Sequence, residues 1–297
     1  MYHNPVLLKK SVDDLVTNPD GIYVDVTFGG GGHSREILKK LSPKGKLYSF
    51  DQDLDALKNT IDDDRFTLIN QNFRFLENSL MAYGITRVDG VLADLGVSSH
   101  QFDEASRGFS TRMNAPLDMR MNVMQVLDAK KIINEYEEEQ LASIFYYYGE
   151  LRESRKLARE IVNHRKTKII ETTDDLKKLF SYIPQFKQNK FFAQVFQAIR
   201  IEVNQELEVL KEMLVQSYNT LKPQGRLVVI SYHSLEDRLV KRFLKNGMFE
   251  GEPARDIYGN FFFIFDLLQT KAIIPSEEEI AENSRARSAK MRVGIKL

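Results

Sequence analysis

Four short apolar runs in the first hundred residues each end at residues that could bind a nucleotide-like ligand. The first run is followed by glycines at 29–32, the second by Asp51, the third by Phe73 and the fourth by Asp94. In an open parallel sheet, ligands bind at the carboxyl ends of the strands, near the point where the strand order reverses. No single member of this series is specific for ligand binding. All four together are, because chance would otherwise have to place each of them at the end of an apolar run. The series therefore predicts a ligand site at one edge of a parallel sheet.

The glycine run follows the residues DVTF and precedes His33. Glycine has no Cβ and tolerates positive φ, so such a run lets the backbone turn tightly and approach a ligand closely. The dinucleotide fingerprint G-x-G-x-x-G fails, because Ser34 occupies the third glycine position counted from Gly29. This failure argues against a pyrophosphate and for a cofactor without phosphates. The alternative interpretation is a tight, flexible turn that binds nothing.

Asp51 follows Asp25 by 26 residues, somewhat more than the spacing of about 20 residues expected for a ribose-binding acid. An ionised carboxylate only accepts hydrogen bonds, so one Asp can bind both hydroxyls of a ribose. The neighbouring Asp53 is predicted to cap the next helix, with Asp55 in its first turn. Phe73 could cover an adenine face, although a phenylalanine of the hydrophobic core would fit the same pattern.

Strands that alternate with helices would position these residues. Strand patterns occur at residues 22–28, 46–50, 66–69 and 88–94, and helix patterns lie between them at 34–41, 54–61 and 75–83. This alternation implies crossover connections, and therefore a parallel sheet that is covered by helices on both faces. Later strands are expected at residues 226–232, 261–268 and 288–296.

The alternation stops after the fourth strand. Residues 104–125 form a loop rich in Arg, Met and Asp, and the pattern from about 126 to 183 is helical, with a helix start at Thr173. A long helix is predicted at 190–221, because apolar residues recur there at spacings of three and four. Its apolar stripe consists of Phe192, Phe196, Ile199, Val203, Leu207, Leu210 and Leu214.

These patterns predict a discontinuous α/β domain. Residues 1–103 and 199–297 would form it, and residues 104–198 would form a helical insertion that recognises the substrate.

Composition excludes several classes of protein. The chain of 297 residues has 42% hydrophobic residues, no cysteine and a formal net charge of zero. The lack of cysteine excludes disulfides, thiolate metal sites and cysteine nucleophiles, and is compatible with a cytoplasmic protein. No segment approaches the roughly 18 apolar residues of a membrane span, and the N-terminus does not resemble a secretory signal. Basic clusters at 151–168 and 285–297 could contact phosphates, although a solvated helix face and a charged tail explain them more simply.

Motifs spread over nearly the full length resemble the RsmH/MraW family of ribosomal RNA methyltransferases. The matching stretches are HNPVLL, DVTFGGGGHS, FDQD, ADLGVSSHQFD, RGFS, LDMRMN, FQAIRIEVNQEL, SYHSLEDRLVK and RARSAKMR. The most specific of them are LGVSSHQFD and SYHSLEDR. Two positions depart from the family pattern, since Gly30 stands where arginine is frequent and Ser284 where proline is frequent.

The resemblance implies an α/β fold of the class I (Rossmann-like) S-adenosylmethionine-dependent methyltransferases, with an inserted helical domain. The implied reaction transfers a methyl group from S-adenosylmethionine to the N4 amino group of a cytidine in 16S ribosomal RNA of the small subunit. The residues that the resemblance assigns to S-adenosylmethionine are Gly31, Gly32, His33, Asp51, Phe73, Asp94 and Gln101.

The same resemblance gives a chemical task to the fourth strand end. Many DNA methyltransferases that modify exocyclic amines hold the amine with an (Asp/Asn/Ser)-Pro-Pro-aromatic motif, whereas this chain has Asp94-Leu95-Gly96-Val97. We infer that Asp94, or the hydroxyls of Ser98 and Ser99, orient the amine for catalysis. Proton loss can follow methyl transfer, so a strong dedicated base is not required.

Further candidates for substrate binding have competing structural interpretations. Asp118 and Arg120 could contact the flipped base or its phosphate, or form an ion pair that orders their loop. Arg200 and Asn204 lie on the polar face of the long helix, for which a solvated surface is the alternative. His233 could line the acceptor pocket, although a lone histidine is more often structural. None of the histidines has metal-ligand spacing, so no catalytic metal is predicted.

Three rival functions make different predictions. A nicotinamide-dependent oxidoreductase is disfavoured by the broken dinucleotide fingerprint, and a DNA N4-cytosine methyltransferase by the missing Pro-Pro motif. A non-enzymatic RNA-binding assembly factor would keep its function when Asp51 or Asp94 is substituted.

Overall fold

The computed structural model describes residues 5–253, 255, 258–259 and 261–297, with the side chain of Ser99 left out. The chain divides into two compact units. Met1–Gly96 and Leu207–Leu297 form the first unit, and Val97–Glu206 form the second. The second unit thus begins earlier and ends later than the insertion predicted at residues 104–198.

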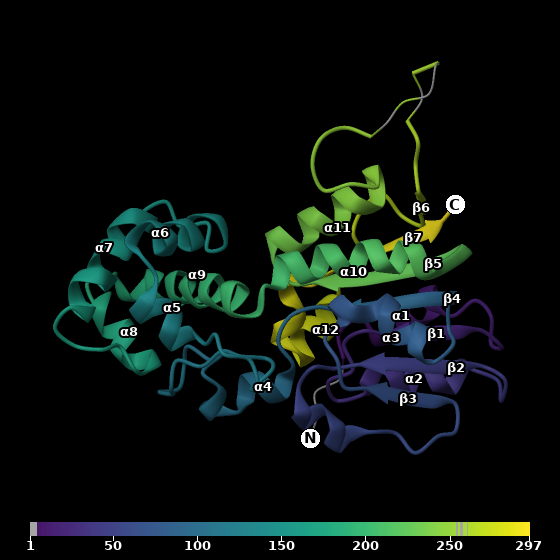
Figure 1. Cartoon of the computed structure of the whole chain (residues 1–297), viewed down its shortest axis with the longest axis horizontal. Helices are drawn as coiled ribbons and strands as arrows, with labels where there is room; N and C mark the ends of the chain where they lie inside the picture. Colours follow the sequence, from purple (N-terminus) through teal and green to yellow (C-terminus); the bar gives the residue numbers. More distant parts are fainter. Residues whose placement is uncertain (1–4, 254, 256–257, 260) are drawn as a thin grey trace. The chain divides into compact units, whose positions relative to one another are not determined.

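The first unit is built on a seven-stranded sheet of order β3-β2-β1-β4-β5-β7-β6 (Figure 1). Its strands are β1 (Ile22–Asp25), β2 (Lys46–Phe50), β3 (Phe66–Ile69), β4 (Val88–Asp94), β5 (Leu221–Ser231), β6 (Phe265–Leu267) and β7 (Lys290–Lys296). Strands β1 to β5 are parallel to one another, whereas β7 is antiparallel to both β5 and β6. The chain order reverses between β1 and β4, which is where such sheets bind ligands.

Helices cover both faces of this sheet, as the alternating pattern predicts. The helices of the first unit are α1 (Leu8–Leu15), α2 (Gly32–Lys40), α3 (Leu76–Ala82), α10 (Glu206–Thr220), α11 (Ser234–Asn246) and α12 (Glu277–Glu282). Helices α3, α10 and α11 share a core with Val91 and Ala93 of β4, while α1 and α2 share another with Leu92. Side chains of neighbouring strand residues point to opposite faces. The central residues 91–93 of β4 are therefore all apolar, because both faces of the strand are buried there.

Several elements differ from the sequence-based prediction. Helices α1, α11 and α12 are not anticipated, and the helix expected at 54–61 is the 3-10 helix Leu54–Asn59. Asp53 caps that helix as predicted, accepting a hydrogen bond of 3.1 Å from the backbone N–H of Asp55. The strand expected at 261–268 shortens to β6, in line with the marginal pairing of an edge strand.

The prediction of one long helix at 190–221 is wrong, because two helices occupy this range. Helix α9 spans Gln185–Asn204. The residue that follows it, Gln205, has a left-handed φ of 51°, and α10 begins at the next residue. The apolar stripe is divided accordingly: Phe196 and Val203 belong to the core of the second unit, and Leu214 belongs to that of the first. A uniform helical periodicity does not reveal that its two halves face different cores.

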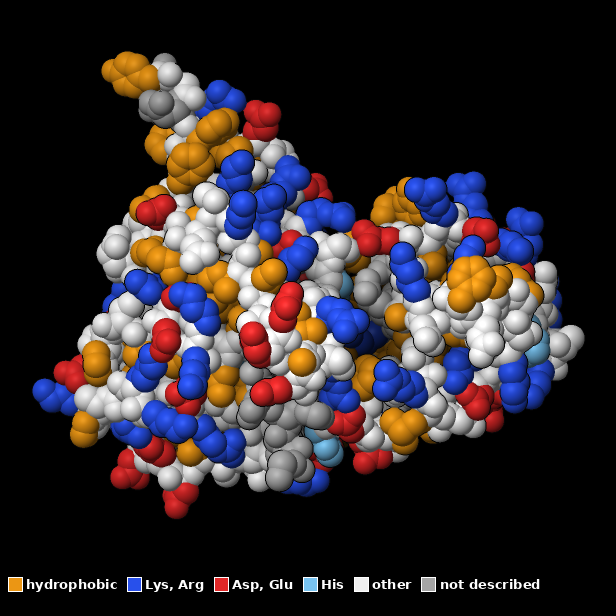
Figure 2. All heavy atoms as spheres, turned by 180° about the vertical axis from the view of Figure 1, so that it is seen from behind, with side chains coloured by type: hydrophobic (Ala, Val, Ile, Leu, Met, Phe, Trp, Pro, Cys, Tyr) orange, Lys and Arg blue, Asp and Glu red, His pale blue; other side chains and the backbone are white. Residues whose placement is uncertain are grey.

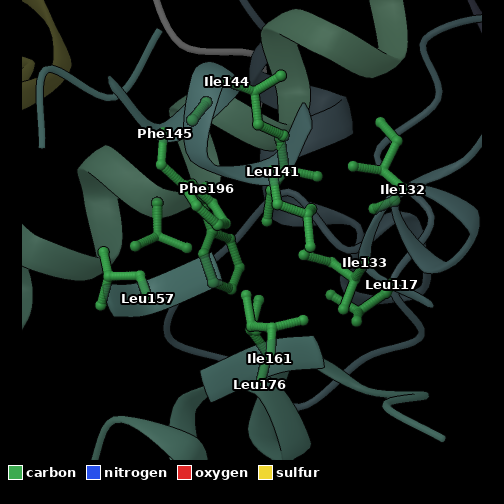
Figure 3. Close-up of a cluster of buried hydrophobic side chains, with 14 of the residues drawn as sticks. Leu117, Ile132, Ile133, Leu141, Ile144, Phe145, Leu157, Ile161, Leu176 and Phe196 are labelled. Carbon is green, nitrogen blue, oxygen red and sulfur yellow. The ribbon is translucent and has the colours of Figure 1, made fainter. Parts of the chain in front are cut away.

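The second unit consists of helices around its own hydrophobic core. Its helices are α4 (Ser99–Asp103), α5 (Ala129–Glu135), α6 (Glu138–Tyr147), α7 (Ser154–Arg165), α8 (Thr173–Leu179) and α9. Figure 3 shows Leu141 and Phe145 of α6, Ile161 of α7 and Phe196 of α9 converging in this core. All buried residues of this core belong to the second unit.

The surface of the molecule carries charged side chains of both signs (Figure 2). None of the helices in the described part of the chain is long and apolar enough to cross a membrane.

Candidate functional site

Asp25, the last residue of β1, anchors the glycine turn that follows it. Its carboxylate accepts hydrogen bonds from the Ser34 hydroxyl (2.7 Å) and from the backbone N–H of Thr27 (3.1 Å). Complete burial raises the pKa of Asp25, and the hydrogen bonds from Ser34 and Thr27 oppose that rise. The turn is therefore fastened at both of its ends to one buried acid.

Two glycines of the turn are required by its geometry. Gly31 has a φ of +74°, and a Cβ there would lie 2.9 Å from the ring of Phe28. A Cβ on Gly32 would lie 2.2 Å from Cγ of Pro5. The backbone thus enters α2 where the protein's own side chains leave no room for a Cβ, so packing within the unit requires both glycines.

Asp51 lies directly after β2 and contacts the same turn. Its two carboxylate oxygens accept hydrogen bonds of 2.8 Å each from the backbone N–H groups of Gly29 and Asp53. Burial raises the pKa of Asp51 to about 6, although these hydrogen bonds oppose the rise. A carboxylate has about four acceptor sites, so Asp51 retains capacity for the hydroxyls of a ligand.

Phe73 begins the 3-10 helix Phe73–Phe75, which follows β3. Asn72 caps this helix and also donates a hydrogen bond of 2.8 Å to the side chain of Gln52. The ring of Phe73 is half-buried against the core of the first unit. The packing thus agrees with a core residue, while the exposed part of the ring could still contact a ligand.

Asp94 ends β4, next to β1 in the sheet. Its backbone N–H donates to the Thr27 hydroxyl (2.7 Å), and one carboxylate oxygen accepts a 2.7 Å hydrogen bond from the Tyr232 hydroxyl. The other oxygen lies 3.7 Å from Nδ1 of His33. The side chain is 21% exposed, so the carboxylate is held by protein groups yet reachable from outside.

The environment of Asp94 determines its charge. Burial raises the pKa of Asp94 to about 6, whereas His33 and the hydrogen bond from Tyr232 lower it, and Asp25 and Glu236 raise it. Burial lowers the pKa of His33 against the charge of Asp94, so His33 is neutral near pH 7. Asp94 is therefore ionised at neutral pH and begins to bind a proton in mildly acidic solution.

His233 caps helix α11. In this capping box the backbone N–H of Glu236 donates to Nδ1 of His233 (3.4 Å), and the Glu236 carboxylate accepts from the backbone N–H of His233 (3.3 Å). The structural interpretation of this histidine thus has direct support. The neighbouring Tyr232 is the last residue of the strand predicted at 226–232, and its hydroxyl contacts Asp94, which the sequence did not predict.

Ser98, Ser99 and Gln101 lie at the start of α4, in the second unit. Ser98 and Gln101 form a capping box, in which each side chain accepts a hydrogen bond from the other residue's backbone N–H (3.2 and 3.1 Å). The Ser99 side chain lies outside the described part of the structure.

Asp118 and Arg120 form the ion pair that was the alternative to substrate binding. Two guanidinium nitrogens of Arg120 donate to the two oxygens of Asp118, at 2.9 and 2.7 Å. Arg120 also donates to the backbone carbonyls of Val123 and Gln125. Burial would raise the pKa of Asp118, but its interactions with Arg120 outweigh that effect and lower it. The pair orders the loop that precedes α5.

The polar face of α9 is used within the second unit. Arg200 forms a bidentate pair with Glu206 at 2.7 and 2.9 Å. Asn204 is buried, donates to the carbonyl of Met119 (2.8 Å) and accepts from the backbone N–H of Met121 (2.8 Å). The amide of Asn204 therefore fastens the 119–121 loop to α9.

The first unit thus brings together the predicted residues of three strand ends, namely Gly31, Gly32, His33, Asp51 and Asp94. The remaining predicted residues, apart from Phe73 and His233, belong to the second unit.

Comparisons with known proteins show which family the whole chain resembles. The model of the MraW methylase family matches residues 1–297. Ribosomal RNA small subunit methyltransferase H of Christiangramia forsetii is 63% identical over 297 residues, which cover 100% of this chain and 98% of the relative. The protein of the same name from Flavobacterium johnsoniae is 61% identical with the same coverage. The crystal structure of TrmN from Thermus thermophilus has a TM-score of 0.43 and 11% identity, covering 98% of this chain and 48% of that one.

Proposed function

The chain belongs to the MraW methylase family, and we propose that it methylates the N4 amino group of a cytidine in 16S ribosomal RNA. It is an S-adenosylmethionine-dependent methyltransferase with a class I fold and a helical insertion. The full-length identity to small-subunit methyltransferases supports ribosomal RNA as the substrate. The carboxylate of Asp94 at the end of β4 is the observation that supports an amine as the acceptor. An enzyme with this substrate would work in the bacterial cytoplasm.

The site of the first unit fits S-adenosylmethionine. When bound, this cofactor supplies a methyl group that its sulfonium has already activated. Asp51 has acceptor sites for the two ribose hydroxyls, and Gly31 and Gly32 keep the turn free of side chains. Phe73 could cover the adenine, and we propose His33, Asp94 and Gln101 as further contacts.

Asp94 would orient the acceptor amine. The exocyclic amine of cytosine carries N–H donors, and an ionised carboxylate accepts hydrogen bonds. Tyr232 and Thr27 hold this carboxylate and its backbone in place. Alignment of donor and acceptor can contribute about 7–11 kcal/mol to a reaction of this kind. Ser98 and Ser99 remain candidates for a second contact with the amine.

The second unit would recognise the RNA around the target base. Asp118, Arg120, Arg200 and Asn204 of this unit, like His233 of the first unit, were candidates for direct contact. The structure uses each of them in a cap, an ion pair or a backbone hydrogen bond. We therefore propose that they act mainly by shaping the surfaces that carry them. Arg120 and Arg200 keep their positive charge and can still attract phosphates.

The test is methyl transfer from labelled S-adenosylmethionine to small ribosomal subunits that lack the modification, with mass spectrometry of the product nucleosides. We expect N4-methylcytidine from the wild type and from Asp62→Asn, a matched change at an exposed acid of the first unit. Asp94→Asn should form N4-methylcytidine at a rate about 10²- to 10⁴-fold lower. Label on another base, or none on RNA despite measured cofactor binding, would contradict the cytidine assignment.

A further inference from the structure

Helix α11 presents a basic face to solvent. Its apolar residues, among them Val240 and Phe243, are buried against the sheet. The cations Arg238, Lys241, Arg242 and Lys245 follow at spacings of three, one and three, which places them on one side of the helix. Arg238, Lys241 and Lys245 are exposed, and Arg242 is half-buried.

The acids of α11 do not offset this charge. Glu236 and Asp237 lie in the first turn, and the remaining helix has no acidic residue. Asp237 is paired with Arg292 (2.6 Å) and Lys290 (3.4 Å) of β7. Glu236 accepts a hydrogen bond of 2.9 Å from the backbone N–H of Tyr232. Beyond the first turn, the charged side chains of α11 itself are therefore all cationic.

Exposed aromatic rings lie beyond the end of α11. The described residues between α11 and β6 project from the sheet (Figure 1). The start of this segment is fixed to the helix, since Phe249 stacks on Phe243 at 5.1 Å and Arg242 donates to the carbonyl of Gly251 (2.7 Å). Phe262 and Phe263 are 59% and 50% exposed. Figure 2 shows several Lys and Arg side chains gathered below the projecting segment.

We propose that the basic face of α11, with Phe262 and Phe263, binds a single-stranded segment of the RNA substrate next to the target cytidine. The inference rests on the proposed function, because it takes its ligand class from it. Cations that follow a backbone, combined with aromatic rings on which bases stack, are the usual means of holding single-stranded nucleic acid. An acidic protein would be attracted by the cations but would not need the exposed rings.

The position of α11 in the fold supports this assignment. The helix starts immediately after Tyr232, whose hydroxyl contacts Asp94 at the proposed acceptor site. It extends from there over 13 residues, which corresponds to about 20 Å. RNA whose target base lies at Asp94 could therefore continue along the helix.

The decisive experiment measures how tightly the full-length protein, with S-adenosylmethionine, binds a labelled single-stranded RNA of about 16 nucleotides. The measurement is repeated over a range of salt concentrations, which gives the slope of log affinity against log salt concentration.

Lys241→Ala/Lys245→Ala should weaken binding on the order of tenfold. It should also reduce the salt slope by about 1.4, since each phosphate contact on a single strand contributes about 0.7. Phe262→Ala/Phe263→Ala should weaken binding by about tenfold or more with little change in slope. The affinity for S-adenosylmethionine should be unchanged in both variants.

Lys9→Ala/Lys44→Ala is the matched control, because it removes the same charge from exposed lysines, one of them on a helix of the opposite face of the sheet. Equal binding by the control and the α11 variant would overturn the proposal. Weaker binding to assembled subunits but not to the free RNA would also overturn it, in favour of a ribosomal protein as the partner. A failure of the proposed function would instead appear as wild-type protein that binds this RNA without methylating small subunits.

Discussion

Polar side chains are buried in both units of this protein, but the two units use them differently. In the first unit, Asp94 accepts one hydrogen bond from a described side chain, and burial raises its pKa to about 6. In the second unit, Asn204 makes hydrogen bonds to a loop with both ends of its amide, and Arg120 pairs with Asp118 through two nitrogens. Asp94 thus keeps acceptor sites for a ligand, whereas Asn204 and Arg120 are engaged by partners within the second unit.

This difference separates two reasons for placing polar groups inside a protein. A buried carboxylate with spare acceptor sites and a raised pKa destabilises the fold, and is expected where a ligand completes its surroundings. A buried amide with full partners stabilises the fold by fixing loops. The two kinds of residue should therefore respond oppositely to substitution, which can be measured.

The largest effect is expected for Asp94→Asn. It should reduce methyl transfer by about 10²- to 10⁴-fold, as the loss of a positioned acceptor in acid–base sites typically does. It should also stabilise the protein at pH 7.5. The pKa of Asp94 is higher in the folded than in the unfolded protein, so protonated Asp94 favours the folded state. That contribution to stability is lost as the pH rises through about 6. An uncharged amide escapes that loss, worth about 1–3 kcal/mol.

Thermal unfolding of wild type and Asp94→Asn at pH 4 and pH 7.5 gives the measurement. The two midpoints should converge at pH 4, where wild-type Asp94 is largely protonated. A variant that is less stable than the wild type at pH 7.5 would show that Asp94 contributes to the fold, and would remove the distinction between the units.

The opposite response is expected for Asn204→Leu in the second unit. The substitution keeps the approximate volume but leaves the carbonyl of Met119 and the N–H of Met121 without their partner. We expect a loss of about 2–6 kcal/mol in unfolding free energy, because each of the two buried groups left unpaired costs about 1–3 kcal/mol. Urea unfolding measures it. Asn189→Leu, at an exposed position of the same helix, should change stability little. Similar losses in both variants would contradict the structural role of Asn204.

The contrast also explains which parts of the site could be predicted from the sequence. Strand ends in a parallel sheet meet at one edge, so the alternating pattern was sufficient to bring Asp51 and Asp94 near the glycine turn. The sequence offered the Asp118–Arg120 ion pair only as an alternative, and it could not show that Asn204 was already paired, because the partners of Asn204 depend on packing. Tyr232 was placed at the correct strand end, but its hydrogen bond to Asp94 depends on a side-chain direction that no pattern carries.

The fold was predictable to a similar extent. Strands β1 to β5 were predicted because each is a short apolar run bounded by turn residues. The division between α9 and α10 was not, since Gln205 adopts a left-handed conformation without being a glycine. Helix α11 was missed as well, although a helix with a cap and a basic face is visible once its N-terminus is known.

A smaller effect is expected at Asp51. Asp51→Asn removes the charge but keeps the shape, and its amide would place a donor near the N–H groups of Gly29 or Asp53. We expect the affinity for S-adenosylmethionine to fall by about 10- to 100-fold, in line with hydrogen bonds to a charged group. Calorimetric titration measures it. A variant with unchanged cofactor affinity but slow methyl transfer would move Asp51 from cofactor binding to catalysis.

The smallest effect is expected for Tyr232→Phe, and it tests whether the proposed acceptor is set by its neighbours. The Tyr232 hydroxyl lowers the pKa of Asp94, so its removal should raise that pKa. If methyl transfer needs ionised Asp94, the acid limb of kcat should move to higher pH by up to about one unit, with similar rates above pH 8. Saturating S-adenosylmethionine removes the contribution of Asp51, whose pKa also lies at about 6. Tyr83→Phe, at an exposed position, is the control. A rate that falls equally at every pH would mean that Tyr232 acts through packing alone. The contrast between Asp94 and the paired groups of the second unit would then be lost.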